Sequence, residues 1–123
     1  MKLEDIKFKA KRLDNGEWIE GEISHFENTI WIVPIEHKPF HSGCAEVDPD
    51  TICMFTGLKD KNDVPIFECD IIDFGGEGEV VFKDGAFYAK FGKYTECLLC
   101  NLVKSGQPVT IVGNKFDRKK GEK

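Results

Sequence analysis

Cys97 and Cys100 have the spacing of half a zinc site or of a redox-active pair. A structural zinc ion takes about four ligands, and the sequence has no second Cys-x-x-Cys pair. The two thiols also bracket an apolar Leu-Leu, and on a strand they would face opposite sides. We therefore interpret them as buried structural thiols rather than as metal ligands.

His37, His41 and Cys44 form a second candidate group, because histidines four positions apart share one face of a helix. Pro39 lies between the two histidines and opposes a regular helix. Residues 34–50 are rich in proline and are expected to form a long, solvated loop, in which a brief turn of helix is allowed. Metal binding by this loop is a minority hypothesis.

Four carboxylates surround a polar turn, and such a group could bind a divalent cation or transfer protons. They are Asp60, Asp63, Glu68 and Asp70. Their spacing does not match a calcium-binding EF-hand loop. Asp60 and Asp63 suit a turn, and Glu68 and Asp70 are expected two residues apart on one strand face. We favour a role in shaping the turn and assign no catalytic, cofactor-binding or metal-binding residue.

A basic strand face is expected where Lys7, Lys9 and Lys11 alternate with apolar residues and Arg12 follows. With the two tryptophans nearby, this face could form a nucleic-acid groove with stacking aromatic rings. Lysines also commonly protect an edge strand from pairing. The net charge of −5 argues against broad binding to nucleic acid, so a solvated face is favoured. Nucleic-acid contact is the leading specific alternative.

The sequence predicts a cytoplasmic protein, and we expect no cofactor because no group of residues is suited to hold one. No run reaches the roughly 20 apolar residues that span a bilayer, and the first residues lack the apolar core of a signal peptide. The odd number of cysteines, five, suits reduced thiols. Apolar residues make up 41% of the 123 residues and include ten Phe, which is enough for a modest core.

Alternating apolar and polar residues predict a chain of short strands separated by turns. Asn15-Gly16 and Asp84-Gly85 predict tight hairpins, and Gly21 predicts a bulge or a close backbone approach. Residues 97–103 are ambiguous between helix and strand. The predicted strands are residues 6–11, 18–26, 29–33, 52–55, 66–72, 79–83, 86–91 and 109–114.

These elements predict a mainly β fold, small, antiparallel and partly barrel-like, with short strands and little helix. We expect one β-rich domain over residues 6–114. The basic tail, residues 115–123, is expected to fray.

Residues 56–72 read TGLKDKNDVPIFECDII, which resembles the signature of the YopX family, approximately TGLKDKNGKEIYEGDIV. These are small proteins of bacteriophages and prophages. Weaker similarities extend from residue 6 to residue 114, with residues 27–46 and 92–108 unmatched. The matching signature positions are Thr56, Gly57, Leu58, Asp60, Asn62, Glu68 and Asp70.

Two positions depart from the family pattern, because Asp63 and Cys69 stand where the family usually has glycine. Asp tolerates a left-handed backbone better than most residues, so the turn can survive at a small cost. At Cys69, either the site has room for a side chain or glycine was never needed for its φ.

The resemblance implies a phage-type origin, a β-rich fold and expression in the cytoplasm of a bacterial host. It implies no reaction and no catalytic residue. We expect a non-enzymatic phage or prophage accessory protein that acts by protein binding or by self-association along exposed strand edges. The alternative is a nucleic-acid-binding small β-barrel, followed by a metal protein or an enzyme.

Overall fold

The computed structural model describes residues 2, 5–34 and 43–117. The chain divides into two compact units, Met1–Phe55 and Thr56–Lys123. Antiparallel strands dominate both units, with one short α-helix among the described residues. The predicted mainly β, antiparallel fold with little helix is therefore confirmed. Neither sheet closes into a barrel within the described part of the chain.

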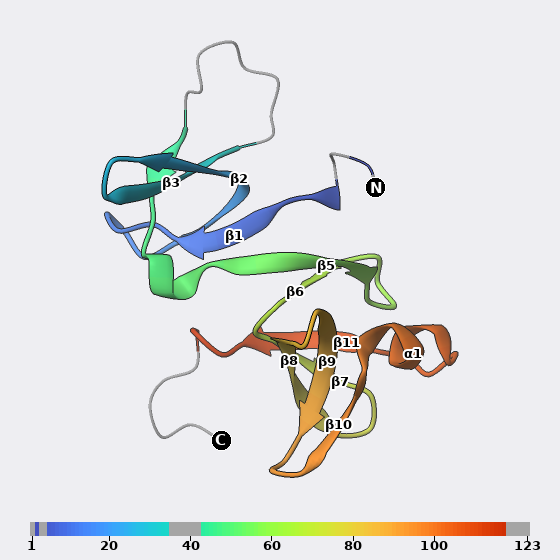
Figure 1. Ribbon diagram of the computed structural model, residues 1–123. Coiled ribbons are helices and arrows are strands. Elements are labelled where there is room, and N and C mark those ends of the chain that lie inside the picture. The colour runs from blue at the N-terminus through green and yellow to red at the C-terminus, as the bar shows by residue number, and fades with distance from the viewer. Residues whose placement is uncertain (1, 3–4, 35–42, 118–123) are drawn as a thin grey trace. The chain divides into compact units, whose positions relative to one another are not determined.

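The first unit is an antiparallel sheet around a small apolar core (Figure 1). Its strands follow the order β4-β3-β2-β1-β5, and β5 continues into the second unit. Ala10, Ile32 and Val47 are the buried centre of the core. The elements are β1 (Phe8–Lys11), β2 (Trp18–Phe26), β3 (Thr29–Val33), β4 (Ala45–Glu46), the 3-10 turn η2 (Pro49–Thr51) and β5 (Cys53–Lys59).

The β1–β2 hairpin is present, but its connection is longer than the predicted two-residue turn. Residues 12–17 join the two strands. The Asn15 Oδ1 atom accepts the Glu17 N–H at 2.9 Å, so the asparagine side chain organises the loop. Gly16 alone has a positive φ among these residues, +73°, whereas a type I′ turn needs two.

Gly21 lies on β2 where the neighbouring strand leaves no room for a side chain. A Cβ atom at this position would lie 2.0 Å from the Val33 carbonyl oxygen. The register of β2 with both β1 and β3 runs without interruption. Of the two predicted alternatives, Gly21 therefore allows a close approach of the two backbones, and β2 has no bulge at this position.

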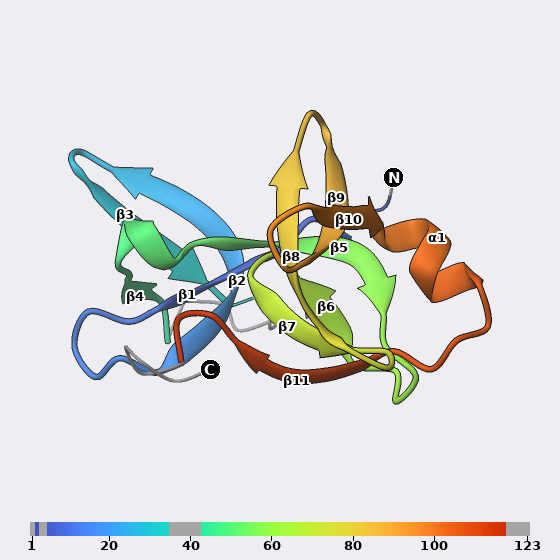
Figure 2. The same ribbon diagram turned by 90° about the horizontal axis from the view of Figure 1, so that it is seen from below.

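The second unit contains the end of β5, a short partner strand and a five-stranded sheet in the order β10-β9-β8-β7-β11. Figure 2 shows β11 running along β7. Ile66, Ile72, Val80, Leu99 and Val109 are buried at the centre of its core. The elements are β6 (Pro65–Phe67), β7 (Asp70–Asp73), β8 (Glu77–Lys83), β9 (Ala86–Phe91), β10 (Thr95–Leu98), α1 (Leu99–Lys104) and β11 (Thr110–Asn114).

The predicted single strand over residues 66–72 is wrong. β6 ends at Phe67 and β7 begins at Asp70, with a turn at Glu68 and Cys69 between them. Cys69 has a φ of +72°, a left-handed conformation that ends regular strand geometry. Glu68 and Asp70 therefore do not share a strand face.

Two other local predictions fall in the second unit, the Asp84-Gly85 turn and the segment over residues 97–103. Asp84 and Gly85 both have positive φ, +51° and +82°, as the predicted tight turn requires. The ambiguous segment, residues 97–103, combines both structures, because it ends β10 and then forms most of α1.

Candidate functional site

The signature turn is held by Asp60, which is 8% exposed. Its Oδ1 atom accepts the N–H groups of Asn62 at 2.8 Å and Val64 at 2.9 Å. Its Oδ2 atom accepts the N–H of Ile111, on β11, at 3.2 Å. One carboxylate therefore closes the turn after β5 and ties it to the last strand of the second unit.

The electrostatics of Asp60 agree with this structural role. Burial acts to raise its pKa, but the three backbone donors and the nearby Lys61 outweigh burial and hold the pKa below its ordinary value. The Lys61 N–H also donates to the Val109 carbonyl at 2.9 Å, next to β11. A carboxylate that stays ionised and is occupied by backbone donors is poorly suited to accept a proton in catalysis.

Asp70 is the second buried carboxylate of the signature and is 2% exposed. Its Oδ2 accepts the Phe67 N–H at 2.8 Å, across the turn at Cys69. Its Oδ1 accepts the side-chain amide of Asn114 at 3.0 Å. The Asn114 Oδ1 in turn accepts the Phe116 N–H at 2.9 Å, so this network joins the start of β7 to the end of β11.

The remaining signature residues also shape the backbone. The Thr56 hydroxyl donates to the Ile66 carbonyl at 2.7 Å, and Gly57 has a φ of +84°. Leu58 packs against the core of the second unit. Asn62 is exposed in the turn, and Glu68 is half-buried in the following one.

The two departures from the family pattern both occupy left-handed backbone positions. Asp63 has a φ of +67° and is exposed, with an ion pair to Lys59 at 3.6 Å. Cys69 has a φ of +72° and is nonetheless buried. Glycine at either position would adopt this backbone without strain, which explains the family preference. At Cys69 the site also has room for a side chain.

The carboxylates around the turn do not converge on a common point. Asp60 and Asp70 bind separate backbone segments, and Asp63 points to an exposed lysine. Among the described residues, no group of three or more His, Cys, Asp or Glu side chains could hold a metal ion. Of the predicted loop group, His37 and His41 lie outside the described residues, and Cys44 is exposed.

Cys97 and Cys100 lie on different elements, β10 and α1, and both are half-buried free thiols. Burial raises the pKa of Cys97, which packs against the core. The Cys100 thiol lies 3.8 Å from the Asn101 Oδ1 atom. A thiol with a raised pKa is less reactive than an ordinary one, which agrees with a structural role for Cys97. The predicted burial is only partial for both thiols.

The predicted basic face is present on β1, although its lysines cover aromatic rings of the same unit. The Lys9 and Lys11 ammonium groups lie 4.8 Å and 5.5 Å from the centre of the Trp18 ring. Lys7 lies 4.7 Å from the centre of the Phe55 ring. These are cation–π distances, so the rings are already in contact with positive charge.

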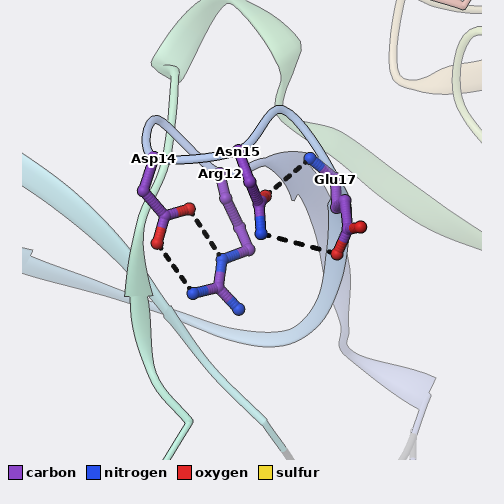
Figure 3. Close-up of polar contacts among 4 residues, drawn as sticks. All are labelled: Arg12, Asp14, Asn15 and Glu17. Carbon is purple, nitrogen blue, oxygen red and sulfur yellow. Dashed lines mark hydrogen bonds and ion pairs between the residues drawn. The ribbon is translucent and has the colours of Figure 1, made fainter.

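Arg12 is directed away from this lysine group and into its own loop. Its Nε and Nη2 atoms donate to the two carboxylate oxygens of Asp14 at 3.0 Å and 2.9 Å (Figure 3). The hydrogen bonds from Arg12 lower the pKa of Asp14. The structure therefore brings three of the four predicted basic residues together with aromatic rings and gives the fourth a local partner.

The β9–β10 hairpin carries a surface that the sequence did not indicate. A hollow of about 310 Å³ is lined by Lys83, Lys90, Lys93, Tyr94, Thr95 and Glu96. These residues come from three strands and the connecting turn, and the strand register brings them together. The signal that could have found them is Asp84-Gly85, because a fixed two-residue turn sets the register of β8 against β9.

A comparison with protein families identifies the fold's relatives by sequence. The family model described as YopX protein matches residues 7–121 of the 123-residue chain, which includes the signature turn and the hairpin surface. No curated protein matches the chain. None of the helices in the described ranges is long and apolar enough to cross a membrane. The chain belongs to the YopX family.

Proposed function

We propose that this protein is a phage or prophage accessory protein that binds another protein chain by adding a strand to β10. The observation that supports this function is the open edge of the five-stranded sheet. Within the described residues, β10 pairs with β9 alone. An edge strand with unpaired backbone groups is a template for an extended segment of a partner.

The opposite edge of the same sheet is less open. On β11, the Ile111 N–H is taken by Asp60, and the preceding Val109 carbonyl accepts the Lys61 N–H. The signature turn therefore occupies part of the β11 edge, which leaves β10 as the better surface for strand addition. The partner is another protein or a second copy of this chain.

The proposal includes action in the cytoplasm of a bacterial host, as a single functional domain over residues 6–114 with a basic tail. Five cysteines without a disulfide bond among the described residues, two of them buried, support a reducing compartment. The family match across both units supports one functional domain. No reaction is proposed, because the buried carboxylates of the signature serve the backbone.

Two proline variants at the β10 edge test this function. Successive residues of a strand direct their N–H groups to opposite sides. Of the two variants Thr95→Pro and Glu96→Pro, one therefore removes an N–H from the open edge and leaves the hydrogen bonds to β9 intact. That variant keeps the fold, and NMR spectra of the backbone amides identify it.

Affinity capture from phage-infected or prophage-bearing cells, together with light scattering over a concentration series, then compares the wild type with that variant. We expect a partner or a concentration-dependent oligomer for the wild type and its loss in the folded variant. Equal capture and equal association by both proteins would contradict strand addition at β10.

A second candidate function is nucleic-acid binding by the lysine face of β1. The observation that favours it is the position of Lys7, Lys9 and Lys11 on one face, two of them beside Trp18. A gel shift with single-stranded DNA and RNA at physiological salt tests it, since nonspecific contacts weaken steeply there. Binding that Lys9→Glu abolishes would support this candidate, and absence of a shift would reject it.

A further inference from the structure

The hollow on the β9–β10 hairpin lies beside the open edge of β10. Thr95 and Glu96 belong to β10 and also line the hollow. Tyr94, the residue just before the strand, is 88% exposed. A strand added next to β10 would bring alternate side chains onto the same face of the sheet as this hollow.

The hollow carries an excess of positive charge. Lys83 is neutralised by Glu96, whose carboxylate oxygen lies 2.5 Å from its ammonium nitrogen. Among the described residues, neither Lys90 nor Lys93 makes an ion pair. Lys93 instead lies 5.7 Å from the centre of the Tyr94 ring.

The two carboxylates opposite Lys90 are engaged elsewhere. Glu79 and Glu96 flank Lys90 in the strand register. Glu96 binds Lys83, and Glu79 lies 3.9 Å from Lys115. The hollow itself is lined by three lysines and one glutamate, which leaves an excess of two positive charges on a protein whose net charge is −5.

We propose that the segment recognised by β10 is an acidic strand, with Asp or Glu at alternate positions that the long side chains of Lys90 and Lys93 reach across β10. Backbone hydrogen bonds supply affinity without regard to sequence, whereas the lysines favour carboxylates and disfavour a basic strand. The exposed Tyr94 ring provides an apolar contact at the end of the hollow. This inference rests on the proposed function, because it names the partner of the same edge.

Selection from a random peptide library displayed on a carrier tests the inference directly, because the library samples acidic, neutral and basic strands alike. We expect the wild-type protein to enrich peptides rich in Asp and Glu. Amide exchange in the presence of one enriched peptide is expected to slow within Thr95–Leu98. The double substitution Lys90→Glu/Lys93→Glu is expected to weaken the binding of that peptide by about tenfold or more, since two attractive charge pairs each become repulsive.

Two controls separate charge recognition from loss of structure. Lys90→Gln/Lys93→Gln removes charge without reversal and should give an intermediate affinity. Lys104→Glu changes a lysine of α1 outside the hollow and should change affinity less than about twofold.

The possible outcomes distinguish this inference from the function on which it rests. Enriched peptides that protect β10 but have no acidic excess would overturn the inference and leave strand addition standing. Failure to enrich any peptide that protects β10 would reject both. Tight binding of single-stranded DNA that depends on Lys90 and Lys93 would overturn the inference in favour of a nucleic-acid surface.

Discussion

Replacement of Asp60 by alanine is expected to lower the free energy of unfolding of the second unit by about 3 kcal/mol. The carboxylate accepts three backbone N–H groups. Those of Asn62 and Val64 belong to exposed residues and can bind water after the substitution, so each loss is modest. The Ile111 bond holds a strand that packs on the core, and it is expected to account for about 2 kcal/mol.

Urea unfolding followed by far-ultraviolet circular dichroism measures this change. Both tryptophans lie in the first unit, on β2 and β3, so their fluorescence does not report directly on the second. Amide exchange at Ile111 provides a local readout, because that N–H loses its acceptor.

Asp63→Asn is the matched control, because Asp63 is an exposed carboxylate in the same turn and asparagine tolerates its positive φ. Its effect should stay below about 0.5 kcal/mol. A cost for Asp60→Ala below about 1 kcal/mol, with Ile111 exchange unchanged, would refute the assignment of Asp60 as the residue that anchors β11.

Three further predictions follow from local geometry. Asp63→Gly should raise the free energy of unfolding by about 0.5 kcal/mol, because glycine adopts a φ of +67° without strain; a decrease in urea-unfolding midpoint would contradict this. Gly78→Ala should lower the free energy of unfolding by about 2 kcal/mol or more, since the new Cβ would lie 2.1 Å from the Phe91 ring. Gly76→Ala is the control, because the space around Gly76 is open, and it should change this free energy by less than about 0.5 kcal/mol. Equal effects of the two substitutions would contradict the close contact between Gly78 and Phe91. The pKa of Asp60 is lower in the folded protein than its ordinary value of 3.8, so the stability that the ionised carboxylate contributes is complete above that pH and is lost as the pH falls through the folded pKa. The difference in free energy of unfolding between wild type and Asp60→Asn should therefore narrow below about pH 4. A constant difference in unfolding measured over an acid titration would contradict this.

The sequence predicted most strands because alternation of apolar and polar residues is a local signal. Ala10 and Ile32 face the core of the first unit as their alternation requires. The Asp84-Gly85 turn was predictable for the same reason, since two adjacent residues determine its type.

Local signals failed where a side chain altered the backbone. The loop after β1 has the Asn-Gly pair of a tight turn, but Asn15 binds the Glu17 N–H and produces a longer connection. The break between β6 and β7 was hidden because Cys69 occupies a position where glycine would have indicated a turn.

The candidate site was the least predictable part, because its contacts join residues far apart in the sequence. Asp60 could be assigned to the turn, but its bond to Ile111 spans 51 positions and has no local signature. The open edge of β10 likewise depends on strand order, which alternation alone does not give.

Amide exchange of the protein bound to a partner captured from host cells tests the proposed function most directly. We expect slower exchange within Thr95–Leu98 in the complex and unchanged exchange of the Ile111 amide, which Asp60 already binds. Protection confined to the β1 lysine face or to another surface, with β10 exchange unaltered, would contradict strand addition at β10.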